Sequence, residues 1–267
     1  MKYTTAYPHT HTTAHWRIGA FIAALCMASS FAAQAQIVDS IWAKANTLYA
    51  AGSYDDALQH YTMIEASGEV SADLFYNIGN TYFKQNNLAK SIIYYERALK
   101  LHPEDRDITH NLDIANAVTI DKIEPVPEFF VTTWIKNIRN SASADTWAWV
   151  SLALFAFVLL LTWFFFFARS VAWRKISFIL AVIVLLFSIN SIVFAGYRKT
   201  ALYDTSAAII TPAVVTVKSS PDASGKDLFI LHEGTKVTIL ETLGEWQSIR
   251  LADGKQGWIL KYAAEVI

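Results

Sequence analysis

Hydrophobic and polar residues follow three successive patterns along the 267-residue chain. Over residues 36–122, apolar positions recur at the three- and four-residue spacing of amphipathic helices. Two later stretches, residues 147–168 and 176–197, are apolar and free of charged side chains. From residue 207 onward the period changes to two, which is typical of half-buried strands. The pattern therefore predicts an all-α part, two long apolar helices and an all-β part.

The helical part repeats itself after about 34 residues, which is the period of a tetratricopeptide helical hairpin. Residues 72–105 resemble that repeat at its aromatic, small and proline positions, which are Phe75, Ile78, Gly79, Tyr82, Tyr95, Ala98 and Pro103. Ser91 replaces the usual alanine at the helix crossing. Residues 38–71 form a weaker unit that keeps Ala45, Gly52, Tyr54, Ala57 and Tyr61 but lacks the proline. A half-repeat over residues 106–120 follows.

These signature residues are expected to pack the hairpins together rather than to bind a ligand. Roughly three repeats are usually needed for a stable solenoid, so we expect a docked partner or the membrane to complete the stack. By analogy with the family, a protein-binding groove would be lined by Trp42, Asn46, Tyr49, Tyr76, Asn80, Phe83 and Lys84.

The predicted groove is aromatic and largely neutral. Some tetratricopeptide proteins clamp a peptide carboxylate with lysine, arginine and asparagine, but here Trp42 stands where the lysine should, and Asp107 and Asn111 replace the other cations. We therefore expect the groove to take an apolar or extended protein segment. The open alternative is that Trp42 and Tyr76 pack on the chain's own linker.

The two apolar stretches are each long enough to cross the roughly 30 Å hydrocarbon core of a bilayer. The loop between them, residues 169–175, contains Arg169, Arg174 and Lys175, which favours a cytoplasmic position for it. Neither stretch contains an ionisable residue, so the hairpin is expected to be an anchor rather than a transport pathway. Polar Ser188, Asn190 and Ser191 are expected at helix–helix contacts.

A linker is predicted over residues 123–146. Within it, Phe130, Trp134 and Ile138 recur at helical spacing, with Lys136 and Arg139 on another face. This pattern indicates a short helix lying in the membrane interface. The alternative is a simple linker.

The strand-rich part, residues 205–267, resembles a bacterial SH3 domain, which implies a small all-β barrel. The resemblance rests on Gly234-Thr235-Lys236-Val237, Glu245-Trp246 and Asp253-Gly254-Lys255-Gln256-Gly257-Trp258-Ile259. Trp246 and Trp258 are candidates for a ligand groove, although in this family such residues more often brace the barrel. The resemblance implies binding of cell-wall peptides or proteins, or a spacer role.

The N-terminal residues 1–35 are interpreted as a signal peptide. Lys2 and Arg17 precede an apolar run, and Ala33-Gln34-Ala35 offers small residues for cleavage. An uncleaved anchor is the alternative. Cleavage would remove Cys26 and a histidine-rich tract, His9, His11 and His15, and would leave no thiol in the mature chain.

No arrangement of residues typical of an enzyme is recognisable. The histidines beyond the signal peptide, His60, His102, His110 and His232, are scattered without metal-ligand spacing. There is no glycine-rich phosphate loop and no nucleophile elbow. We expect no catalytic activity, no cofactor and no metal, and the formal net charge of -1 gives no reason to expect nucleic acid.

The order of parts resembles the BatE type of Bat (aerotolerance operon) proteins. The resemblance implies a two-pass protein of the bacterial inner membrane whose helical repeats and SH3-like domain face the periplasm. It further implies a scaffold in a complex linked to aerotolerance or envelope stress, with von Willebrand factor A-containing Bat proteins as partners. The alternative function is a peptidoglycan receptor acting through the SH3-like domain.

Overall fold

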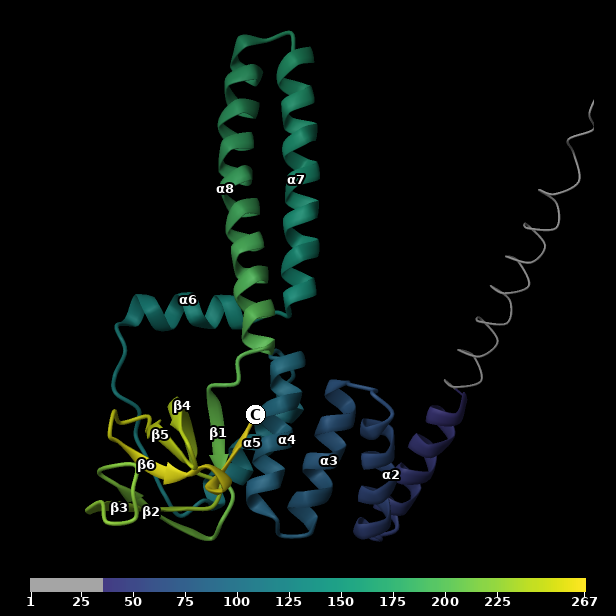
Figure 1. Cartoon of the computed structure of the whole chain (residues 1–267). Helices are drawn as coiled ribbons and strands as arrows, with labels where there is room; N and C mark the ends of the chain where they lie inside the picture. Colours follow the sequence, from purple (N-terminus) through teal and green to yellow (C-terminus); the bar gives the residue numbers. More distant parts are fainter. Residues whose placement is uncertain (1–35) are drawn as a thin grey trace, which may run out of the picture. The chain divides into compact units, whose positions relative to one another are not determined.

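The computed structural model describes residues 36–267 (Figure 1). The predictions made for residues 1–35, which include the signal peptide, lie outside the described residues. The chain divides into two compact units, with the boundary between Glu69 and Val70.

The first unit contains a pair of helices. Residues 36–50 are helical, and α2 follows over Tyr54–Ala66. The turn between them contains Gly52 at φ +80°, a left-handed conformation that glycine adopts at no steric cost. Ala45, Ala57, Tyr61 and Ile64 are buried. Ser53 precedes α2, but its side chain makes no capping hydrogen bond to the described residues.

The second unit begins with three helices of the repeat, whose starts are set by polar caps. The Ser71 hydroxyl accepts from the Leu74 amide, the Asn87 side chain from the Lys90 amide, and Asp105 from the amides of Asp107 and Ile108. A Cβ on Gly79 would lie 2.7 Å from the Tyr95 ring, which explains the glycine at this helix crossing. The helices are α3 (Ala72–Lys84), α4 (Leu88–Leu101) and α5 (Arg106–Val118).

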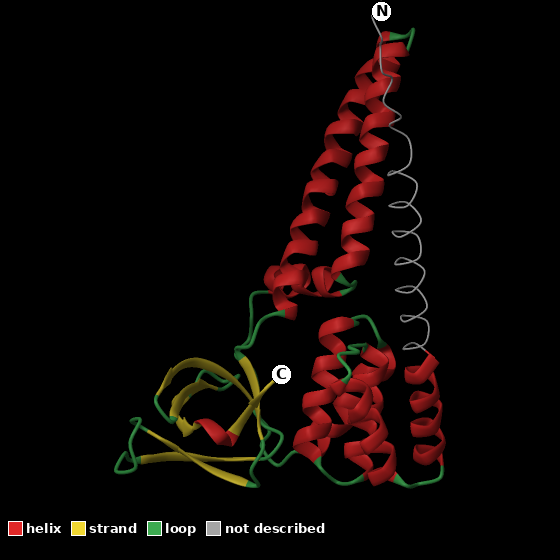
Figure 2. Cartoon of the chain, turned by 45° about the vertical axis from the view of Figure 1, so that its right-hand side comes forward, coloured by secondary structure: helices red, strands yellow, loops and turns green. Residues whose placement is uncertain are grey.

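Two long helices and a shorter one follow. Figures 1 and 2 show α7 and α8 side by side as a hairpin, with α6 crosswise near the end where the hairpin joins the rest of the unit. Arg174 and Lys175 lie within α8, because only residues 168–170 connect the two long helices. Both helices are long and apolar enough to cross a membrane. The bounds are α6 Phe130–Asn140, α7 Ala144–Phe167 and α8 Val171–Leu202.

Two serines join α7 to α8 by hydrogen bonds. The Ser151 hydroxyl donates to the Ser188 carbonyl at 3.0 Å, and the Ser188 hydroxyl donates to the Ser151 carbonyl at 3.0 Å. Each bond satisfies a polar group that apolar surroundings would otherwise leave unpaired. The prediction of a helix–helix contact is therefore confirmed for Ser188. Ser191 is also buried, and its hydroxyl donates to the Phe187 carbonyl of its own helix, whereas Asn190 is exposed and donates to the Leu186 carbonyl.

The C-terminal part is an antiparallel sheet in the order β3-β2-β6-β5-β4-β1-β7. The predicted alternating strands are confirmed, but the predicted small barrel is not closed, because the sheet is open with β3 and β7 at its edges. The strands are β1 Ala207–Ile210, β2 Val214–Lys218, β3 Asp227–His232, β4 Lys236–Leu243, β5 Trp246–Arg250, β6 Gln256–Leu260 and β7 Ala264–Val266.

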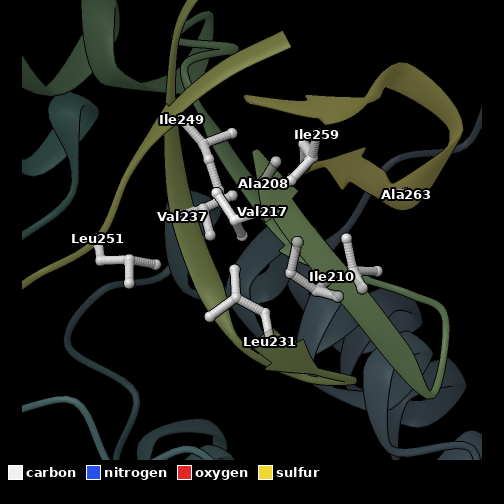
Figure 3. Packing of buried hydrophobic residues seen from close by; sticks show 10 residues of the cluster. Ala208, Ile210, Val217, Leu231, Val237, Ile249, Leu251, Ile259 and Ala263 are labelled. Atoms are coloured by element: carbon white, nitrogen blue, oxygen red, sulfur yellow. The ribbon is translucent and has the colours of Figure 1, made fainter. Parts of the chain in front are cut away.

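The sheet curls around one hydrophobic core (Figure 3). Gly257 lies where a Cβ would collide with the Val217 side chain, so only glycine allows this close approach of β6 and β2. Ile123, from the segment that follows α5, also packs against the core, so this segment belongs to the strand module. The buried members are Ala208, Ile210, Val215, Val217, Leu231, Val237, Ile249, Leu251, Ile259 and Ala263.

The strand module packs directly against the repeat helices, which the sequence did not predict. Glu265 of β7 lies 2.7 Å from the Lys90 ammonium and 3.3 Å from the Arg97 guanidinium, both on α4. Arg97 also donates to the Val266 carbonyl. Gly234 packs so closely that a Cβ would lie 2.8 Å from Thr119 and 3.0 Å from Ile92. We call these contacts, together with those of Asp121, the helix–strand joint.

Asp121 is the most highly bonded residue of the helix–strand joint. Its carboxylate accepts from the His232 amide and the Thr235 hydroxyl, each at 2.7 Å, and lies 2.9 Å from the His232 ring nitrogen. Burial raises the pKa of Asp121, but the hydrogen bonds from Thr235 and His232 outweigh burial and hold the pKa below its usual 3.8. The joint therefore depends on an ionised Asp121.

Candidate protein-binding site

Asparagine and tyrosine side chains form a neutral network on the repeat of the second unit. The Tyr95 hydroxyl donates to Asn80 Oδ1 at 2.7 Å, and the Asn111 amide nitrogen donates to the same oxygen at 2.9 Å. Asn111 also donates to the Tyr76 hydroxyl at 2.9 Å. Three helices, α3, α4 and α5, thereby contribute to one hydrogen-bonded group, which we call the Asn80 network.

The first unit contains the same arrangement 34 residues earlier in the sequence, a displacement that brings Asn46 onto Asn80 and Tyr61 onto Tyr95. The Tyr61 hydroxyl donates to Asn46 Oδ1 at 2.6 Å, and the Trp42 ring packs edge-on against Tyr61 with centroids 5.8 Å apart. Burial and then the charge of Tyr49 raise the pKa of Tyr61 to about 12. The Tyr61 hydroxyl therefore stays protonated and able to donate at neutral pH.

These bonds determine what each asparagine can offer to a partner. Because the carbonyl oxygen of the side chain accepts the tyrosine hydroxyl, the amide nitrogen remains as a donor. Asn46 is exposed and Asn80 is half-buried. A donor held in this way suits the main-chain carbonyl of an extended protein segment, which is the class of ligand expected from the sequence.

The other predicted groove residues lie on the same helices as these two asparagines. Tyr49 packs edge-on against Tyr54 in the first unit, and Tyr76 packs against Tyr95 in the second, with ring centroids 5.4 and 6.0 Å apart. Phe83 is half-buried and Lys84 is exposed near the end of α3. Sequence reasoning noted Asn111 only as a missing cation, whereas the structure makes it the residue that joins α5 to the network.

The strand module offers a second candidate surface. A cavity of about 220 Å³ is lined by Trp246 and Tyr262, with Lys218 at its side. Tyr262 is 76% exposed, so a large aromatic surface is presented there. Trp258 lies opposite Lys218 and Ser248 in the sheet and does not line this cavity. Tyr262 was missed by the sequence analysis because no motif distinguishes an exposed tyrosine from an ordinary surface residue.

Among residues 36–267, no group of three histidine, cysteine, aspartate or glutamate side chains is placed to hold a metal ion. His232 instead pairs with Asp121 in the helix–strand joint.

Taken together, the described chain consists of a short helical repeat and a curled antiparallel strand module, with an apolar two-helix hairpin between them in the sequence. Residues 72–105 match the tetratricopeptide repeat family, and residues 213–264 match the bacterial SH3 domain family. No curated protein matches the chain. The two matches support a binding role, because the first family is associated with protein interactions and the second often with the cell wall.

Proposed function

We propose that the protein is a membrane-anchored scaffold of the bacterial envelope that binds other proteins through its helical repeats and has no catalytic activity. The carrying observation is the Asn80 network, a neutral surface with a free amide donor, in a chain that also contains two helices able to cross a membrane. A hairpin of two spans returns the chain to its starting side, so the repeats and the strand module would face the same compartment.

The inner membrane, with both parts in the periplasm, is the location we propose. The basic residues between the spans and the signal-like N-terminus support it. The order of parts supports a Bat-type complex linked to aerotolerance or envelope stress, with von Willebrand factor A-containing proteins as partners. The neutral character of the Asn80 network favours an extended, uncharged segment of such a partner over a free carboxylate.

Site-specific photocrosslinking in cells tests this proposal. A photoreactive residue at Tyr76 or Lys84 should crosslink to a membrane or periplasmic protein, and Asn80→Ala should reduce that product. Asp222, in a turn of the strand module, is the control position. Products confined to the chain itself at all three positions would contradict the proposal and favour packing of the groove on the chain's own segments.

The second candidate function is peptidoglycan binding by the strand module, favoured by the cavity of about 220 Å³ beside Trp246 and Tyr262. The detergent-purified full chain should be retained by insoluble peptidoglycan. Trp246→Ala and Tyr262→Ala should each reduce retention, whereas Trp258→Ala, outside the cavity, is the matched control. Equal retention of all three variants, or none by the natural chain, would contradict this function.

A further inference from the structure

A basic hollow lies where the ends of α6 and α8 meet. It has a volume of about 530 Å³ and is lined by two arginines from different elements, Arg139 from the last turn of α6 and Arg198 from α8. Asp204 is the one acidic residue in its lining, and Asp204 Oδ1 already accepts from the Ser206 amide at 2.9 Å. The lining therefore has an excess of positive charge. The complete lining is Arg139, Asn140, Tyr197, Arg198, Thr200, Ala201, Tyr203 and Asp204.

Among residues 36–267, Arg139 is held in place without an acidic partner. Its guanidinium carbon lies 5.3 Å from the centre of the Tyr197 ring, within the range of a cation–π contact. The Trp147 indole donates to the Arg139 carbonyl at 2.9 Å and fixes the backbone at that position. Arg139 Nε makes one long hydrogen bond, 3.4 Å, to Asn140. Within the described part of the chain, most of the donors of this guanidinium are therefore left for a ligand.

Arg198 has a donor that the described residues do not satisfy. One terminal nitrogen donates to the Lys100 carbonyl at 3.2 Å, whereas Nε is buried and has no hydrogen-bond partner among residues 36–267. Neither arginine forms an ion pair within the same residues. A buried donor of a charged group without an acceptor is costly, and two like charges beside one hollow repel each other. An anion would relieve both costs.

The position of the hollow indicates the kind of anion. It lies at the same end of the hairpin as α6, whose Phe130 and Trp134 are 73% and 63% exposed. Exposed aromatic residues beside the end of a membrane span mark the level of the lipid headgroups. At that level the available anion is the phosphate of a phospholipid, and arginine guanidinia bind phosphate oxygens bidentately.

We propose that Arg139 and Arg198 together bind the headgroup phosphate of an anionic phospholipid. This inference rests on the membrane anchoring proposed above. The bound lipid would fasten α6 to α8 and fix the hairpin relative to the membrane surface. Lys100, which donates to the Asp204 carbonyl, lies next to the hollow and links the site to α4.

The test uses the full chain in bilayers of equal parts phosphatidylglycerol and phosphatidylcholine, with the lipids that stay bound after mild detergent extraction identified by native mass spectrometry. The natural chain should retain phosphatidylglycerol preferentially. Arg139→Gln and Arg198→Gln should each lower that preference about fivefold, which corresponds to about 1 kcal/mol for each cation near the headgroups. Arg174→Gln is the matched control, since Arg174 lies 5.1 Å from the Phe165 ring at the other end of α8.

Flotation of the same vesicles separates this inference from the proposed anchoring. Vesicles that float without the natural chain would contradict the anchoring itself. A chain that floats with the vesicles but shows no lipid preference would overturn the headgroup site alone. An equal loss of phosphatidylglycerol preference in the Arg174→Gln control would mean that the preference comes from general surface charge, which would also overturn the headgroup site. Complete displacement of the lipid by millimolar inorganic phosphate would identify a site for free anions, which also overturns the proposal.

Discussion

Two polar networks lie on the repeat helices, and they differ in charge. The Asn80 network is neutral and involves α3, α4 and α5, and among the described residues the Asn80 amide nitrogen has no hydrogen-bond acceptor. The helix–strand joint is charged, involves α4, the segment after α5 and the strand module, and satisfies its carboxylates within the chain. The comparison teaches that α4 uses its charged positions within the chain, whereas its neutral tyrosine belongs to the network that we propose for a partner.

The helix–strand joint also shows what covers the end of this short stack of helices. The sequence led us to expect a docked partner or the membrane at the end of the stack. In the structure, the strand module of the same chain packs there, against Ile92 and Thr119 through Gly234. An internal module is always present, so the stack does not depend on partner concentration.

Gly234→Ala should have the largest effect, because it disturbs both the backbone conformation and the packing of the helix–strand joint. The residue has φ +83°, and a Cβ would press on Thr119 and Ile92. We expect a loss of about 3 kcal/mol in the free energy of unfolding, from backbone strain and overpacking together. Chemical denaturation of the full chain in detergent measures this loss, and hydrogen exchange locates it.

Gly254→Ala is the matched control for that substitution. Gly254 has φ +89° but no atom within 4 Å of the position of a Cβ. In this control the free energy of unfolding should fall only by the cost of backbone strain, about 1 kcal/mol. Equal losses in both variants would mean that the contact between the strand module and the helices contributes nothing to stability.

Asp121→Asn should be second in size, with a loss of about 2 kcal/mol, since hydrogen bonds to a charged acceptor are replaced by weaker ones. The effect should depend on pH. The folded-state pKa lies below the unfolded value of 3.8, so the contribution is present above pH 3.8 and is lost as the pH falls from there through the lower folded-state pKa. In the variant, hydrogen exchange of β3 should lose this acid dependence. Asp113→Asn, on the exposed side of α5, should not differ from the natural chain.

The two networks were not equally predictable from the sequence. Asn46 and Asn80 recur with the repeat period, so the family resemblance located them directly. The joint left no such signal, because it connects single residues far apart in the chain, such as Lys90 and Glu265. Alternation of apolar residues predicted the strands, but closure of a barrel depends on pairing between the edge strands, which alternation does not encode.

Tyr95→Phe should cost about 1 kcal/mol, because it removes the hydroxyl that orients Asn80. Tyr61→Phe is the equivalent change in the first unit. With a pKa of about 12 in the fold against 10 when unfolded, Tyr61 should contribute stability below pH 10 that is lost as the pH rises from 10 to 12. Denaturation at increasing pH checks this. If Tyr61→Phe showed the same alkaline loss, another group would be responsible.

Ser91→Ala should have the smallest effect and the opposite sign. Ser91 is fully buried at the helix crossing beside Gly79, and its hydroxyl has no hydrogen-bond partner among the described residues. The carboxylates of the helix–strand joint are satisfied within the chain, whereas this buried hydroxyl carries a desolvation cost that alanine removes. We expect the free energy of unfolding to rise by about 0.5–1 kcal/mol. Ser67→Ala, whose hydroxyl bonds to the Ile64 carbonyl at 2.7 Å, is the control and should not be stabilised. A loss of stability in Ser91→Ala would show that the serine has a partner at the crossing and that the departure from the usual alanine is favourable.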